Sequence, residues 1–124
     1  MTEIEKPNTP GIANTAKLPE MPVKATPATN VEQIVRQAAR KYGVNEDYLV
    51  RIARCESNLN PNAVNHNYYE NGNPSGIFQH ISGYWPARAA KYGYAGASVF
   101  DAYSNANVTA AMFRDGLSGL WECK

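Results

Sequence analysis

Apolar residues from position 31 onward follow the spacing of a helix that is buried on one face. In residues 31–42 they recur at i, i+3, i+4, i+7, i+8 and i+11, at Val31, Ile34, Val35, Ala38, Ala39 and Tyr42. Asn30 with Gln33 has the form of an N-terminal capping box, and Gly43 is a typical C-terminal stop. The pattern predicts a first helix over residues 31–42.

A second helix is predicted from Asn45 to Ser57. Asn45 is a favourable N-cap, and Glu46 and Asp47 place negative charge in the first turn, where the helix dipole favours it. The apolar positions Tyr48, Leu49, Ile52 and Ala53 again follow the helical period. Because only a short turn separates the two helices, we expect the first to pack against the second.

The segment that follows changes character. Residues 58–75 contain seven asparagines and two prolines and show neither the helical nor the strand period. A polar loop of this length in a small domain is more often functional than idle. Residues 76–81 form a short apolar piece, which we expect to be extended.

Two more helices and a returning C-terminus complete the pattern. Ser82 is the expected cap of a helix that accepts Pro86 near its start and ends at Gly93. Asp101 is the expected cap of a last, alanine-rich helix that stops at Gly116. Residues 117–123 should then fold back over the body through Trp121. The prediction is a mainly α domain of four or five helices with a long loop or small β element.

Residues 1–30 differ from the rest in composition. They hold five of the eight prolines, five threonines and no aromatic residue, which is typical of an extended tail or linker. We therefore divide the chain into a tail, residues 1–30, and a folded domain, residues 31–124. The tail is either a leader without a role or a peptide that lies along another protein.

Charge and hydropathy exclude several partners. From residue 31 onward nine Lys and Arg face eight Asp and Glu, so no basic surface is predicted for nucleic acid or an anionic membrane. No apolar run approaches the ~20 residues that a membrane span needs, and the first residues lack the apolar segment of a secretory signal. We expect no nucleic-acid partner, no membrane insertion and no cofactor.

The chain has two cysteines, Cys55 and Cys123. With His66 and His80 they do not show the ligand spacing of a zinc site. A disulfide between them would close a long loop, worth on the order of 4 kcal/mol in the chain-entropy model, and would indicate an oxidising compartment. The alternative is two unpaired buried thiols.

Glu56 is the candidate catalytic group. It follows Leu49, Ile52 and Ala53 at positions that share one helix face, so its carboxyl should turn toward the core at the mouth of the polar loop. Cleaving a glycosidic bond near neutral pH needs a carboxyl that an apolar setting keeps protonated. An exposed glutamate at a helix end is the commoner outcome for such a position taken alone.

The residues around Glu56 resemble a known signature. Glu56-Ser57-x-Leu59-x-Pro61-x-Ala63-x-Asn65, followed by Gly76-Ile77-Phe78-Gln79, resembles the paired motifs of the soluble lytic transglycosylase family. The later helix, in which Asn107 precedes Val108 and alanines, is also similar to that family. The resemblance covers residues 31–123.

The resemblance implies a lysozyme-like fold and a reaction. Glu56 would act as the sole acid and base in a non-hydrolytic cut of the MurNAc–GlcNAc β-1,4 bond of peptidoglycan, giving a 1,6-anhydro end. Ser57 would hydrogen-bond near Glu56 or the sugar's acetamido group, and Gly76 and Gln79 would line the saccharide cleft. One or two of the aromatic residues at 68, 69, 84, 85, 92 and 94 should stack on sugar rings, with Tyr68 the choice for substrate binding.

The sequence departs from the family at Phe78, where Met is usual, and lacks a clear counterpart of the late Ala-Tyr-Asn motif. Cys55 with Trp121-x-Cys123 instead resembles small disulfide-closed members of the lysozyme superfamily, such as resuscitation-promoting factors and virion-associated muralytic proteins. The alternatives are a hydrolytic muramidase and a non-catalytic structural or glycan-binding component. We expect an extracytoplasmic or virion location, with residues 1–30 contacting a virion or secretion-apparatus protein.

Overall fold

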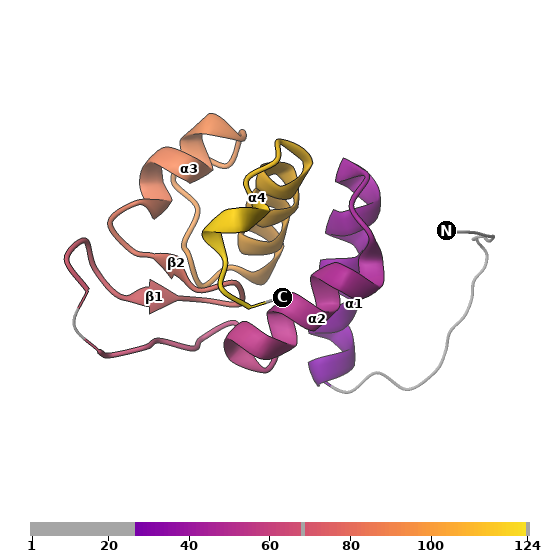
Figure 1. Ribbon diagram of the computed structural model, residues 1–124, viewed down its shortest axis with the longest axis horizontal. Coiled ribbons are helices and arrows are strands. Elements are labelled where there is room, and N and C mark those ends of the chain that lie inside the picture. Colours follow the sequence, from indigo (N-terminus) through magenta and orange to yellow (C-terminus); the bar gives the residue numbers. More distant parts are fainter. Residues whose placement is uncertain (1–26, 68, 124) are drawn as a thin grey trace. The chain divides into compact units, whose positions relative to one another are not determined.

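The fold is mainly helical. The computed structural model describes residues 27–67 and 69–123, and these form α1 (Pro27–Tyr42), α2 (Glu46–Ser57), β1 (Pro74–Ser75), β2 (His80–Ile81), α3 (Trp85–Lys91), α4 (Ala102–Arg114) and a 3-10 turn, η1 (Ser118–Leu120) (Figure 1). The predicted fold class is therefore confirmed. Residues 1–26 of the predicted tail lie outside the described residues, and so does Tyr68.

Helix α4 forms the centre of the folded unit. Every residue from Ser104 to Met112 is buried, which requires neighbours on all sides of the helix. Figure 1 shows α4 between the α1–α2 pair and α3. The alanines at 106, 110 and 111 have little or no exposed surface and allow the neighbouring elements to approach closely.

Helices α1 and α2 pack together as the sequence predicts. Gly43 ends α1 at a φ of 73°, and the Asn45 side chain caps α2 by accepting a hydrogen bond from the Tyr48 N–H at 2.8 Å. Ion pairs join the two helices, with Arg36 bound to Asp47 at 2.9 Å and Arg54 bound to Glu32 at 2.8 Å.

The start of α1 differs from the prediction. The helix begins at Pro27, so Asn30 lies within its first turn and is not the N-cap. Proline is well suited to the first turn, because its fixed φ is helical and the N–H that it lacks has no partner there. Pro27, which the composition assigns to the tail, is instead part of the helix.

Two further predictions were wrong in detail. Residues 76–81 are not one extended piece, because β1 and β2 pair antiparallel with Pro74 opposite Ile81, and residues 76–79 form the turn between them. Ser82 does not cap α3, which begins at Trp85 without a side-chain cap. The Ser82 hydroxyl instead accepts a hydrogen bond from the Asn73 N–H at 3.1 Å and so stabilises the hairpin.

The C-terminal segment returns to the body, as predicted. After α4 and η1 the chain passes back toward the end of α2, and Trp121 is buried with 5% of its surface exposed. Asp101 caps α4 by accepting a hydrogen bond from the Ser104 N–H at 3.1 Å, and Gly116 follows the helix at a φ of 84°. Within residues 27–67 and 69–123, no helix is long and apolar enough to cross a membrane.

Candidate active site

Glu56 lies in the last turn of α2 and is partly buried. The helix ends directly after it, because Asn58 adopts the left-handed conformation with a φ of 55° and returns its N–H to the carbonyls of Ala53 and Arg54. Burial raises the pKa of Glu56, and the negative charge of Glu122 raises it further, while a backbone hydrogen bond from Cys123 acts in the opposite direction. The site therefore favours the protonated acid.

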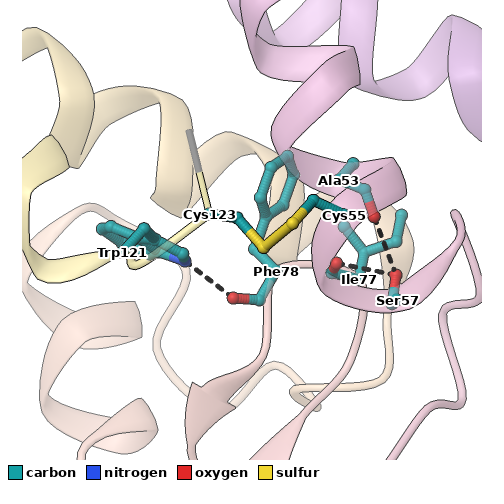
Figure 2. Close-up of a disulfide and its surroundings, with 7 residues drawn as sticks. All are labelled: Ala53, Cys55, Ser57, Ile77, Phe78, Trp121 and Cys123. Atoms are coloured by element: carbon teal, nitrogen blue, oxygen red, sulfur yellow. Dashed lines mark hydrogen bonds between the residues drawn. A yellow bond between two sulfur atoms is a disulfide. The ribbon is translucent and has the colours of Figure 1, made fainter.

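Ser57 connects the end of α2 to the turn between the two strands. Its hydroxyl lies 2.8 Å from the carbonyl oxygen of Ile77 and 3.3 Å from that of Ala53 (Figure 2). It also accepts a hydrogen bond from the Asn60 N–H at 3.2 Å. Because the hydroxyl has a single proton, it donates to the nearer acceptor, the Ile77 carbonyl. Ser57 thus fixes residues 76–79 relative to Glu56.

Gly76 opens this turn and is buried. Its φ of 80° is a conformation that favours glycine, and a Cβ there would collide with the Asn105 amide and the Val99 carbonyl. The sequence predicted that Gly76 lines the saccharide cleft. The structure explains why a glycine is required here, because the turn packs against α4 so closely that no side chain fits.

Asn105 of α4 holds the same turn from behind. Its side-chain oxygen accepts a hydrogen bond from the Phe78 N–H at 3.2 Å, and its amide donates to the Val99 carbonyl at 2.8 Å. Sequence reasoning singled out Asn107 and missed Asn105. The Asn107 amide donates to the Tyr103 carbonyl at 2.8 Å within the same helix. The available signal for Asn105 was a pair of polar residues four positions apart in an alanine-rich helix, Asn105 and Thr109, which share one helix face.

Gln79 closes the turn. Its φ of 57° is unusual for a residue other than glycine, and its amide nitrogen lies 2.9 Å from the Gly76 carbonyl and 3.2 Å from the Ala63 carbonyl. The side chain is only partly buried. Gln79 therefore ties the turn to the loop after α2.

The C-terminal segment reaches this site through a disulfide. Cys55 and Cys123 are bonded, which confirms the disulfide and excludes the free thiols (Figure 2). Two residues earlier, the Trp121 indole donates a hydrogen bond to the Phe78 carbonyl at 2.7 Å. Both ends of the predicted site, Glu56 and the Gly76–Gln79 turn, thus contact residues 121–123.

A buried histidine lies behind the turn. His80 is 1% exposed, with Nε2 at 2.7 Å from Thr109 Oγ1 and Nδ1 at 3.0 Å from an Arg88 nitrogen. The Thr109 hydroxyl donates to the Asn105 carbonyl, so it accepts from His80, whose proton we assign to Nε2. Burial, with a smaller contribution from the Arg88 charge, lowers the pKa of His80 to about 3. His80 is a neutral structural residue.

The exposed aromatic residues near the long loop are Tyr69 and Tyr84. They are 39% and 44% exposed, and each hydroxyl meets a loop asparagine, Asn65 at 3.3 Å and Asn71 at 2.6 Å. Trp85 belongs to the core and donates to the Ala97 carbonyl at 2.7 Å. Among the described residues, no group of three or more His, Cys, Asp or Glu side chains could hold a metal ion.

The chain is similar to enzymes that act on murein. Over 33 residues it is 54% identical to the proteins named membrane-bound lytic murein transglycosylase C of Klebsiella pneumoniae (strain 342), Cronobacter sakazakii (strain ATCC BAA-894) and Salmonella typhimurium (strain LT2). Each match covers 27% of this chain and 9% of the relative's length.

No solved structure gives a significant match to the chain. The family of transglycosylase SLT domains matches residues 33–121, which include Glu56, the Gly76–Gln79 turn and all of α4. The chain therefore belongs to the transglycosylase SLT domain family.

Proposed function

We propose that the protein is a lytic transglycosylase that cleaves the MurNAc–GlcNAc β-1,4 bond of peptidoglycan. The observation that carries the proposal is the placement of Glu56, a carboxyl with a raised pKa. The next residue, Ser57, is hydrogen-bonded to the turn that carries the second family motif. A raised pKa keeps the acid protonated at pH values where an ordinary glutamate is ionised.

One carboxyl is enough for this reaction. The Glu56 proton passes to the glycosidic oxygen, the bond from that oxygen to C1 of MurNAc breaks, and the substrate's acetamido oxygen stabilises the cation at C1. The resulting carboxylate then takes the proton of the MurNAc C6 hydroxyl, and O6 bonds to C1. Glu56 returns to its protonated state, and no water is consumed.

The remaining predicted residues have supporting roles in this proposal. Ser57 and Gly76 shape the turn, and the Gln79 amide oxygen contacts the sugar. Tyr69 and Tyr84 supply exposed faces for stacking on sugar rings. Tyr68 lies outside the described residues and stays a prediction for substrate binding. A ring stacked on a sugar buries apolar surface without requiring a charged partner, which suits an uncharged glycan backbone.

Clearing of purified sacculi tests the assignment of the acid. Wild-type protein should lower the turbidity of a sacculus suspension, and Glu56→Gln should not, because the amide keeps the shape but has no acidic proton to donate. Glu70→Gln is a suitable control, since this glutamate is exposed in the long loop and is also neutralised without a change of shape. Equal clearing by wild type and Glu56→Gln would refute the proposal.

We place the action of the enzyme outside the cytoplasm, because the Cys55–Cys123 bond persists in oxidising compartments. Delivery by a virion or secretion apparatus, with residues 1–30 contacting a component of it, remains the prediction from the sequence. A protein that lacks residues 1–26 keeps all of α1 and should keep its sacculus-clearing activity while losing incorporation into particles. Unchanged incorporation would contradict the docking role.

A further inference from the structure

The geometry points to residues Trp121–Cys123 as a positioning element of the active site, which holds Glu56 and the Gly76–Gln79 turn in register while the Cys55–Cys123 bond is closed. The inference deepens the proposed function and rests on Glu56 being the acid. Its basis is that this short segment contacts both halves of the site, although it is far from both in sequence.

The first contact is made by Trp121. Its indole donates to the Phe78 carbonyl at 2.7 Å, across 43 residues of sequence. The ring is fixed by edge-on packing against His80 and Phe113, with centroid distances of 5.5 and 5.0 Å. Since Phe78 also donates its N–H to the Asn105 side chain, both backbone polar groups of Phe78 are held, one by α4 and the other by the C-terminal segment. The turn is therefore clamped in one position.

The second contact is made by Cys123. It is bonded to Cys55, the residue directly before Glu56, and its backbone also interacts with the Glu56 carboxyl. A covalent bond at the neighbouring residue fixes the separation between the C-terminal backbone and the acid. Opening the disulfide would leave this backbone without a covalent link to α2, and the acid would lose its fixed partner.

Glu122, between these two anchors, supplies a charge. Among the described residues it is the charged group that acts on Glu56. The cations of α2 are engaged elsewhere, with Arg54 paired to Glu32 at 2.8 Å and Arg51 over the Tyr48 ring at 5.1 Å. Glu122 is itself exposed, so its removal should alter the electrostatics of the site and leave the fold intact.

Turnover in a disulfide-free variant is the first test. Sacculus clearing by wild type and Glu56→Gln first establishes that the acid is required. In the double variant Cys55→Ser with Cys123→Ser, we expect apparent kcat to fall on the order of tenfold or more with KM nearly unchanged, since displaced catalytic groups slow chemistry more than binding. Circular dichroism should show the helices intact. A folded double variant with wild-type kcat would overturn the inference.

The pH profile of Glu122→Gln is the second test and does not depend on whether the cysteine variant folds. Removing this negative charge should lower the pKa of Glu56 and move the alkaline limb of the activity profile to lower pH. Asp47→Asn is the matched control, since it neutralises an acid in the first turn of the same helix and should leave that limb in place. An unshifted limb in Glu122→Gln would overturn the inference.

An NMR titration of the Glu56 side-chain carboxyl separates the inference from the proposed function, because it requires no turnover. The titration midpoint should fall in Glu122→Gln and stay unchanged in Asp47→Asn. If the midpoint falls while sacculi are not cleaved, the proposed function fails, although the interaction of residues 121–123 with the Glu56 carboxyl is established. If the midpoint does not move in an active enzyme, the inference fails and the function stands.

Discussion

The Ser57 hydroxyl donates to the Ile77 carbonyl at 2.8 Å, and this bond joins the helix that carries Glu56 to the turn that carries Gln79. The two residues are 20 positions apart, and both family motifs meet at this contact (Figure 2). The hydroxyl hydrogen-bonds to backbone groups of the protein itself, which explains why a small polar residue is needed directly after the acid.

Ser57→Ala should destabilise the protein by about 1 to 3 kcal/mol, because the Ile77 carbonyl loses its donor. The Asn60 N–H loses the hydroxyl as an acceptor and keeps only the Ser57 backbone carbonyl at 3.1 Å. Sacculus-clearing activity should fall together with stability. Chemical denaturation measures the first effect. Ser98→Ala is the control, since Ser98 is exposed and its hydroxyl accepts a hydrogen bond from the nearby Phe100 N–H, and this substitution should cost less. Equal costs for the two variants would contradict the bridging role.

Gly76→Ala should be far more damaging than Gly43→Ala. Both residues have a positive φ, at 80° and 73°, so both substitutions carry the strain of about 1 kcal/mol that a Cβ brings there. Only Gly76 has neighbours that the Cβ would strike, the Asn105 amide and the Val99 carbonyl, whereas Gly43 has nothing within 4 Å. Thermal unfolding should show a much lower Tm for Gly76→Ala. Similar Tm values would contradict the packing.

His80 should make the fold sensitive to acid. Its pKa is about 3 when folded and near 6.5 when unfolded, so below pH 6.5 the unfolded chain binds a proton that the folded chain does not. Stability is therefore fully present above pH 6.5 and falls as the pH drops toward 3, by up to about 1.4 kcal/mol per pH unit. In His80→Gln, denaturant unfolding should show lower stability at pH 7 and a flatter decline toward pH 4. A decline as steep as that of wild type would contradict a buried neutral imidazole.

Glu56 should have the opposite effect on stability. Because its pKa is raised in the folded state, its stabilising contribution is complete below the unfolded value, near 4.5, and is lost as the pH rises through the folded pKa. Glu56→Gln should therefore gain stability relative to wild type between pH 4 and pH 8. Denaturant unfolding at both pH values measures the gain, and a gain that does not change with pH would contradict the raised pKa.

The helices could be predicted well from the sequence, because their signals are local. The apolar period, Asn45 and Asp101 as caps, and Gly43 as a stop each act within one or two turns, and the structure confirms all of them. The predicted start of α1 lies too late in the chain, because the composition places Pro27 in the tail, whereas a proline is compatible with a first helical turn. The prediction that Ser82 caps α3 was also wrong, since its hydroxyl accepts a hydrogen bond within the hairpin instead.

The support behind the turn could not be predicted, because it joins distant segments. Asn105 contacts Phe78 across 27 residues, and Trp121 contacts the same residue across 43. Sequence spacing does not reveal such pairs. His80 illustrates the same limit, because its position next to the second motif gave no indication that Thr109 and Arg88 would satisfy both ring nitrogens. The disulfide was the exception, since the chain has only two cysteines.

Mass spectrometry of the fragments released from purified peptidoglycan tests the central claim most directly. Wild-type protein should release muropeptides with 1,6-anhydro-MurNAc ends, one water lighter than reducing ends, and Glu56→Gln should release none. Reducing MurNAc ends from the wild type would mean that water attacks the bond and that the protein is a muramidase. Anhydro ends from Glu56→Gln at the wild-type rate would contradict the account, because the acid would then be another residue.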